Sequence, residues 1–343
     1  MPPDFVLGCE RSGSTWLANV LDAHARCEVY LEPFADYAGI LPGLPGRGEP
    51  LEAPSAAQLH AVRAGFARLP DLKHPWLYRP GRAPAWRRLD HLLGAAVAGV
   101  ARLRGVPPPL SLQRQRLLDL HGARTPGALR TRKQTQDRVV VVKELRLCLQ
   151  AALVRGAFPD ARCLVVVRDP GAQIASVRRL FARGHLGELR RALPRLAASL
   201  VAAERLRRYR PLAEHLCGDV ASPEALLAWW LVSYDVLLAD CRRLGIPHHV
   251  MYHEALARDP EREAGAALAF LGLDLSPEAL RYLRASSSRD VDPDAPLSTF
   301  RDAATHSERT RGAVSPAVRR CARAMIEKYA ESEALRRYAT AAP

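Results

Sequence analysis

The chain of 343 residues lacks long apolar runs and paired cysteines, and each absence excludes a class of protein. Its most apolar stretch, Leu92 to Val100, is far too short to cross a bilayer and is followed by Arg102, so we expect no membrane span. The seven cysteines form no Cys-x-x-Cys pair, which favours reduced, mostly buried thiols over a disulfide framework. Because nothing before the first apolar run resembles a signal peptide, we expect a soluble cytoplasmic protein.

Lysine is scarce as well, and the net charge of +14 comes almost entirely from arginine. The arginines are scattered over helical patterns without the interleaved aromatic residues of a surface that binds single strands. We therefore expect no nucleic-acid partner, although a positive cleft would speed the capture of a polyanionic ligand. A nucleic-acid binder is the alternative, and it predicts steep, salt-dependent binding to arbitrary DNA.

One loop has the spacing of a phosphate-binding loop but lacks that loop's lysine. It runs from Gly8 to Thr15, between an apolar run typical of a buried strand and a segment with helical spacing. Free backbone N–H groups and the dipole of a helix N-terminus suit this position to an anion. Because Ser14 stands where the lysine would reach the β- and γ-phosphates, a triphosphatase is disfavoured. The cation is instead Arg11, which favours a group shorter than a triphosphate.

Short, valine-rich apolar runs separated by helical patterns predict an α/β fold, a P-loop-like parallel sheet flanked by helices. The expected strands are residues 5–8, 139–143, 163–167 and 248–252. Ligands of such sheets bind at the carboxyl ends of the strands. We expect a single domain over residues 1–343, since the informative motifs are spread along the chain.

Two regions without a defensible strand, residues 36–137 and 184–245, are expected to be helical insertions on the acceptor side of the cleft. Partial disorder of the first region is the competing interpretation. In the second, the helical runs 186–210 and 223–244 are expected to pack as a pair. Trp229 and Trp230 are predicted to be core residues rather than ligand contacts.

Three segments resemble a known family, the sulfotransferases that use 3′-phosphoadenosine 5′-phosphosulfate (PAPS). The first, Arg11-Ser12-Gly13-Ser14-Thr15-Trp16-Leu17 followed by Tyr30-Leu31-Glu32-Pro33-Phe34, resembles the segment that binds the 5′-phosphosulfate. The second, Leu164 to Pro170 with the later Ser176, resembles the 3′-phosphate element. The third, Val250 to Leu256 with Phe270 to Leu273, resembles a mainly structural segment. Arginine at position 11, where aryl enzymes usually carry lysine, makes the carbohydrate and tyrosylprotein branches the closer match.

The resemblance implies PAPS as sulfuryl donor and a hydroxyl acceptor on a small molecule, lipid or glycan. The residues implied to bind the nucleotide are Arg11, Ser12, Gly13, Ser14, Thr15, Trp16, Arg168 and Ser176. Arg309 or Arg311 would cover the cofactor, although the family more often has Trp-Arg or Arg-Lys-Gly there. Since the leaving phosphate is already held by these donors, and no cluster of metal ligands is evident, we expect no metal.

Three residues are the catalytic candidates. Glu32 matches the glutamate that deprotonates the acceptor in resembling enzymes, and its alternative role is to cap a turn before Pro33. Lys143 ends the valine-rich strand and matches a lysine that stabilises the leaving oxygen; its alternative is an ion pair with Glu144 or another acid. Arg11 would neutralise charge on the transferred group. His253 and His306 are the next candidates for a base.

Two other functions stay open at this point. A small-molecule kinase could use the same loop, although the missing lysine counts against it, and ATP consumption without sulfate transfer would favour it. An inactive relative that only binds nucleotides predicts binding of the desulfated product, 3′-phosphoadenosine 5′-phosphate (PAP), with no turnover.

Overall fold

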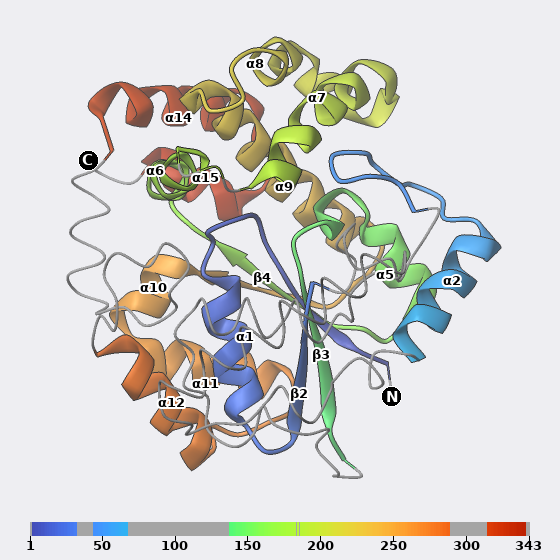
Figure 1. Cartoon of the computed structure of the whole chain (residues 1–343), viewed down its shortest axis with the longest axis vertical. Coiled ribbons are helices and arrows are strands. Elements are labelled where there is room, and N and C mark those ends of the chain that lie inside the picture. Colours follow the sequence, from blue (N-terminus) through green and yellow to red (C-terminus); the bar gives the residue numbers. More distant parts are fainter. Residues whose placement is uncertain are drawn as a thin grey trace, which may run out of the picture.

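The computed structural model describes residues 2–32, 44–67, 137–182, 184, 186–288 and 314–340, which are organised around one parallel sheet (Figure 1). Its strands are β1 (Asp4–Leu7), β2 (Cys27–Leu31), β3 (Val139–Glu144), β4 (Cys163–Val167) and β5 (His248–Tyr252). Their order is β2-β3-β1-β4-β5, and every neighbouring pair is parallel. The α/β fold predicted from sequence is confirmed. The strands β3 and β2 lie on one side of β1, and β4 and β5 lie on the other. The direction of strand addition therefore reverses at β1, and sheets of this kind bind ligands at the carboxyl ends of the strands at such a switch point.

The strand β2 was not among the expected strands, because a glutamate interrupts its apolar run. Glu28 is nevertheless fully buried, and it is neutralised by Arg138, whose Nη1 lies 3.1 Å from Glu28 Oε2. The Tyr30 hydroxyl also donates to Glu28 Oε1 at 2.9 Å. Partners of this kind allow a charged side chain to be buried in a β-strand. The sequence around Glu28 does not reveal the distant partner, Arg138.

Alternate residues of each strand enter two different cores, as expected for a sheet covered on both faces. Val6 packs with α1 (Ser14–Ala23), α11 (Pro260–Phe270) and α12 (Pro277–Ser287). Phe5 and Leu7 face the larger core, which includes α5 (Ala151–Ala157) and α9 (Pro223–Arg243). Figure 1 shows α1, α11 and α12 gathered on one side of the strands and α5 on the other.

The remaining described helices each add residues to one or the other of these cores. They are α2 (Ala56–Ala67), η4 (Leu147–Leu149), α6 (Pro170–Phe181), α7 (Gly187–Ala202), the 3₁₀ helix η5 (Glu204–Leu212), α8 (Ala213–Cys217), α10 (His253–Arg258), α14 (Pro316–Tyr329) and α15 (Glu333–Thr340). None of the described helices has the length and apolarity needed to cross a membrane. Five of the seven cysteines are buried, which confirms the prediction of mostly buried thiols.

Both runs of the predicted helical pair are helical, but the first run is divided. The run expected at 186–210 forms α7, which ends at Ala202, and then η5. The run expected at 223–244 is the long helix α9. Trp229 and Trp230 on α9 are 4% and 1% exposed, which confirms that they are core residues. Of the other predicted helical region, residues 44–67 are described and include α2, whereas 36–43 and 68–136 lie outside the described residues.

Candidate active site

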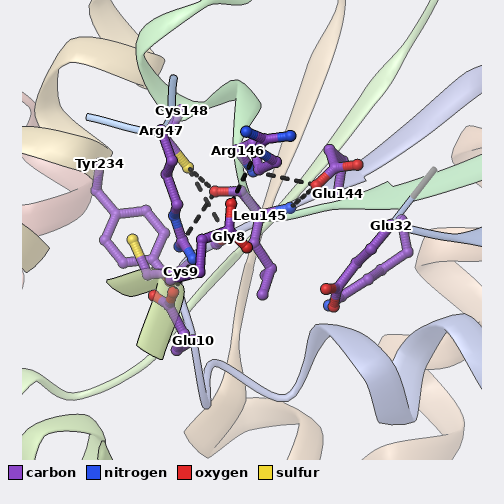
Figure 2. Close-up of polar contacts among 12 residues, drawn as sticks. Gly8, Cys9, Glu10, Glu32, Arg47, Glu144, Leu145, Arg146, Cys148 and Tyr234 are labelled. Atoms are coloured by element: carbon purple, nitrogen blue, oxygen red, sulfur yellow. Dashed lines mark hydrogen bonds and ion pairs between the residues drawn. The ribbon is translucent and has the colours of Figure 1, made fainter. Parts of the chain in front are cut away.

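The carboxyl ends of four neighbouring strands bring the predicted functional residues to one edge of the sheet. The loop from Gly8 to Gly13 follows β1, Glu32 follows β2, Lys143 lies near the end of β3, and Arg168 follows β4. Figure 2 shows Glu32, Glu144 and the start of the loop meeting at this edge. Residues separated by more than a hundred positions in sequence therefore lie within one small volume.

The loop after β1 follows the backbone path that its glycines allow. A Cβ at Gly8 would lie 2.9 Å from the Val166 carbonyl oxygen of β4, closer than real side chains approach. Gly13 has φ 94°, and a Cβ there would lie 2.6 Å from Cδ2 of His253. Glycine is therefore required at both positions, at the first by close packing and at the second by backbone conformation as well.

The helix α1 begins at Ser14 with its first backbone N–H groups directed at the loop. Its N-cap residue, Gly13, has no side chain to bond these groups, and no acidic residue lies in the first turn. The Ser14 N–H donates a long bond of 3.4 Å to Ser12 Oγ in the loop. An uncapped helix N-terminus of this kind provides donors and positive potential for an anion.

Arg11 joins the loop to the helix that follows β4. Its Nε donates to Ser176 Oγ at 3.0 Å, and its carbonyl oxygen accepts from Arg168 Nη1 at 2.9 Å. Arg168 is buried, and this burial lowers the pKa of its guanidinium. Its own carbonyl oxygen accepts from the Trp230 indole N–H at 3.1 Å. The structure therefore brings together Arg11, Arg168 and Ser176, which the sequence placed in two separate motifs.

Glu32 and Lys143 form an ion pair between Lys143 Nζ and Glu32 Oε1. Lys143 is buried, while the Glu32 side chain is 22% exposed and so reaches the surface of the site. The backbones are also joined, because the Glu32 N–H donates to the Lys143 carbonyl oxygen at 2.7 Å. Glu144 is not the partner of Lys143; its Oε1 accepts from the Leu145 and Arg146 N–H groups.

Two of the catalytic candidates have strained backbones. Arg11 has φ 65° and Glu32 has φ 48°, and within the described ranges Leu186 is the other non-glycine residue with positive φ. Such conformations cost on the order of 1–3 kcal/mol and are concentrated at functional sites. In this conformation the Glu32 carboxylate pairs with Lys143 of β3.

The segment after β5 bonds to the N-terminus of α6. Glu254 Oε1 accepts from the Asp169 N–H, and Glu254 Oε2 accepts from the Tyr338 hydroxyl, both at 2.8 Å. Burial, followed by the charge of Glu254, raises the pKa of Tyr338. This is the structural role expected for the segment. His253, the next residue back, lies against Gly13 of the loop.

Several residues that support the loop were not found by sequence reasoning. The Tyr234 hydroxyl of α9 accepts from the Cys9 N–H at 3.1 Å and donates to the Val166 carbonyl oxygen at 2.8 Å. Glu10 forms a buried ion pair with Arg47. Neither contact has a local sequence signal, because each joins the loop to a distant segment.

The structure also describes other residues predicted to contact the nucleotide. Ser12 is fully buried, and Thr15 is half-buried at the start of α1. The Trp16 indole N–H donates to Ser286 Oγ at 2.9 Å, so its ring lies against α12. Some residues named in the sequence analysis lie outside the described residues. They are Pro33, Phe34, His306, Arg309 and Arg311.

The family model described as Sulfotransferase family matches residues 3–216, a range that contains every described candidate residue named above from Gly8 to Ser176. The chain is also similar to solved structures. The sulfotransferase domain from the Synechococcus PCC 7002 olefin synthase is 20% identical, with a TM-score of 0.45 over 95% of this chain and 94% of that one. The sulfotransferase domain from the curacin biosynthetic pathway is 14% identical, with a TM-score of 0.43 over 99% and 97%. The Alicyclobacillus acidocaldarius sulfotransferase is 15% identical, with a TM-score of 0.39 over 98% and 99%. No curated protein matches the chain.

Proposed function

The chain belongs to the sulfotransferase family, and we propose that it transfers the sulfuryl group of PAPS to an acceptor hydroxyl by in-line displacement, with Glu32 as the base. The observation that best supports this proposal is the position of Arg11. Its guanidinium contacts Ser176 of the second anion-binding element, while its own loop is the first. One nucleotide with a phosphate at each end of its ribose would engage both elements at once.

The donor groups of the site have the chemistry that PAPS requires. The uncapped N-terminus of α1, with Ser14 and Thr15, offers N–H and O–H donors to the 5′-phosphosulfate. Arg168 and Ser176 would hold the 3′-phosphate, and Arg11 lies between the two elements. We assign Arg309 or Arg311 to the cover of the nucleotide on the family resemblance alone. When bound, PAPS supplies a sulfuryl group attached to a phosphate leaving group.

Glu32 removes the proton of the acceptor hydroxyl as that oxygen forms its bond to sulfur. The bond between sulfur and the bridging phosphate oxygen breaks in the same displacement, and negative charge develops on that oxygen. Lys143 donates to the bridging oxygen, and Arg11 with the N–H groups of α1 neutralises the charge on the sulfuryl oxygens. The ammonium of Lys143 has three donors, so it can pair with Glu32 and still contact the leaving oxygen.

Replacement of Glu32 by glutamine tests this assignment. Because Glu32→Gln removes the base but keeps a hydrogen-bonding side chain, we expect kcat to fall by about 10²- to 10⁴-fold, while PAP binds as tightly as to the wild type. Turnover is measured with labelled PAPS and an extract of the source cell's metabolites, with mass spectrometry to find the product that gains a sulfate. PAP binding is measured by calorimetry.

The matched control is Glu144→Gln, at the end of the adjacent strand. Glu144 is buried and bonds backbone N–H groups, and glutamine can still accept those bonds. We expect its turnover to stay within about threefold of wild type, since it takes no part in proton removal. Unchanged turnover in Glu32→Gln would end the assignment of the base. Wild-type protein that binds PAP but transfers nothing to any acceptor would indicate an inactive nucleotide binder instead.

A further inference from the structure

We propose that Arg47 is a positioning residue for the phosphate loop, which it serves by pairing with Glu10, and this inference rests on the proposed function. Glu10 precedes Arg11 in the loop, and a free carboxylate there would compete with the nucleotide for the Arg11 guanidinium. Arg47 pairs with Glu10 and so keeps this carboxylate in a buried ion pair. Arg11 keeps its bond to Ser176 and, in the proposed function, contacts the phosphates when the nucleotide binds.

The pair is buried on both sides. Glu10 and Arg47 are each 3% exposed, and Arg47 Nη1 pairs with Glu10 Oε1. The guanidinium carbon of Arg47 lies 5.1 Å from the centre of the Trp229 ring, and Arg47 Nη2 donates a long bond of 3.4 Å to the Leu145 carbonyl oxygen. Figure 2 shows the Arg47 side chain passing Cys148 to reach the loop beside Cys9 and Glu10.

The segment that carries Arg47 is fixed to the rest of the protein independently of the pair. Gly48 has φ 90°, and a Cβ there would lie 2.4 Å from the Ala192 carbonyl oxygen of α7. The Gln150 amide donates to the carbonyl oxygens of Pro45 and Gly46 at 3.2 Å and to that of Glu49 at 3.0 Å. Close packing at Gly48 and the bonds of Gln150 therefore fix the backbone around Arg47. The position of the guanidinium beside the loop does not depend on its ion pair with Glu10.

The charges explain why a pair is needed at this place. A buried carboxylate without a partner is strongly unfavourable, and it would repel the phosphates that the neighbouring N–H groups attract. Burial alone lowers the pKa of Arg47, but Glu10 and Glu188 raise it above its ordinary value, so the guanidinium stays charged. If Arg47 is removed, the nearest cation along the chain from Glu10 is Arg11. Glu10 then turns to Arg11 and withdraws it from the nucleotide site.

Calorimetry with PAP on three variants tests this inference. Arg47→Met keeps an apolar stem over Trp229 but leaves Glu10 without its partner, and we expect PAP binding to weaken by at least about tenfold. Glu10→Gln removes the competing carboxylate, so its affinity is expected to stay within about threefold of wild type. The double variant Glu10→Gln/Arg47→Met is expected to regain affinity to within about threefold of wild type.

Binding measured at a temperature where every variant is fully folded, as judged from its melting temperature, separates positioning from a merely structural role. If the pair only stabilised the fold, folded Arg47→Met would bind PAP as tightly as wild type, because the substitution would lower stability without touching the nucleotide site. The inference is overturned by that result, or by a double variant that binds PAP no better than Arg47→Met. Wild-type protein that binds no PAP contradicts the proposed function, and this inference with it.

Should Arg47→Met fail to fold, Arg47→Lys takes its place. Lysine keeps a buried cation but cannot both reach Glu10 and cover Trp229 as the guanidinium does. We expect a weakening of PAP binding by about threefold, which Glu10→Gln again removes. Equal and weak binding by Arg47→Lys with and without Glu10→Gln would overturn the inference in the same way.

Discussion

The turns that follow β1 and β4 lie side by side and share the same strand-to-helix plan, yet their helix N-termini differ. At the β4 turn, Asp169 is the N-cap of α6, and its carboxylate accepts from the Ala172 N–H at 2.7 Å. Pro170 occupies the first position of that helix, where no N–H is needed. At the β1 turn, the N-cap of α1 is Gly13, which has no side chain to offer.

In the proposed function, this difference divides anion binding between the backbone of one turn and the side chains of the other. The helix α6 satisfies its first N–H groups with its own cap, whereas α1 leaves them open to a ligand. On the α6 side the groups proposed to bind the anion are the side chains of Arg168 and Ser176, and both contact Arg11. In the proposed function, the backbone therefore holds the 5′ end of PAPS and the side chains hold its 3′-phosphate.

The largest effect on PAP binding is expected from a methyl group added at Gly13, in the uncapped turn after β1. Gly13→Ala forces a non-glycine residue into φ 94° and towards the ring of His253. The conformation alone costs roughly 1–2 kcal/mol, so the loop should shift and PAP affinity should fall by about tenfold or more. Calorimetry with PAP measures this change.

Gly171→Ala, near the start of α6, is the matched control for that substitution. A Cβ there would meet a methyl group of Val314 at 2.6 Å, but the backbone is helical and carries no ligand in the proposed function. We expect PAP affinity to stay within about threefold of wild type even if the melting temperature falls. Equal losses of affinity for the two alanine variants would contradict the division between the turns.

A smaller effect is expected from Ser176→Ala, which tests the side-chain half of the comparison. The substitution removes the acceptor of the Arg11 Nε bond and the hydroxyl assigned to the 3′-phosphate. We expect PAP binding to weaken by about three- to tenfold, corresponding to loss of roughly one hydrogen bond of ~1 kcal/mol. Ser287→Ala, whose hydroxyl donates to the Leu283 carbonyl oxygen on α12, is the control. If both variants bound PAP equally well, the contact of Arg11 with Ser176 would have no role in binding.

The edge of the sheet where the site lies could be predicted from the sequence because parallel strands place their carboxyl ends together. The expected strands at 139–143, 163–167 and 248–252 agree with the structure to within one residue. The resemblance to the family assigned Arg11, Arg168 and Ser176 to one nucleotide, and the parallel pairing of the strands explains why residues that follow them meet. Local pattern and chain topology were sufficient to predict the edge of the sheet, while the roles of these residues came from the resemblance.

The supports of the loop could not be predicted, because each depends on packing between distant segments. Glu10 and Arg47 are 37 positions apart, and nothing in either neighbourhood shows that both are buried. Tyr234 lies in a helix whose sequence predicts only a core position, yet its hydroxyl bonds the loop. The strand β2 was missed for the same reason, since the partners of Glu28 make its burial possible.

The smallest effect on PAP binding is expected from Asp169→Ala, which removes the side-chain cap of the turn after β4. Loss of the N-cap should lower the free energy of unfolding by about 1 kcal/mol, whereas Asp169→Asn, which can still accept from the Ala172 N–H, should lose only a fraction of this. Denaturant unfolding measures both values, and calorimetry should show PAP affinity within about threefold of wild type for each variant. A large stability loss in Asp169→Asn would mean that the carboxylate charge, rather than the cap geometry, matters at this turn. If Asp169→Ala instead bound PAP more tightly, the N–H groups freed on α6 would lie within reach of the nucleotide, and the two turns would share the backbone role assigned here to α1 alone.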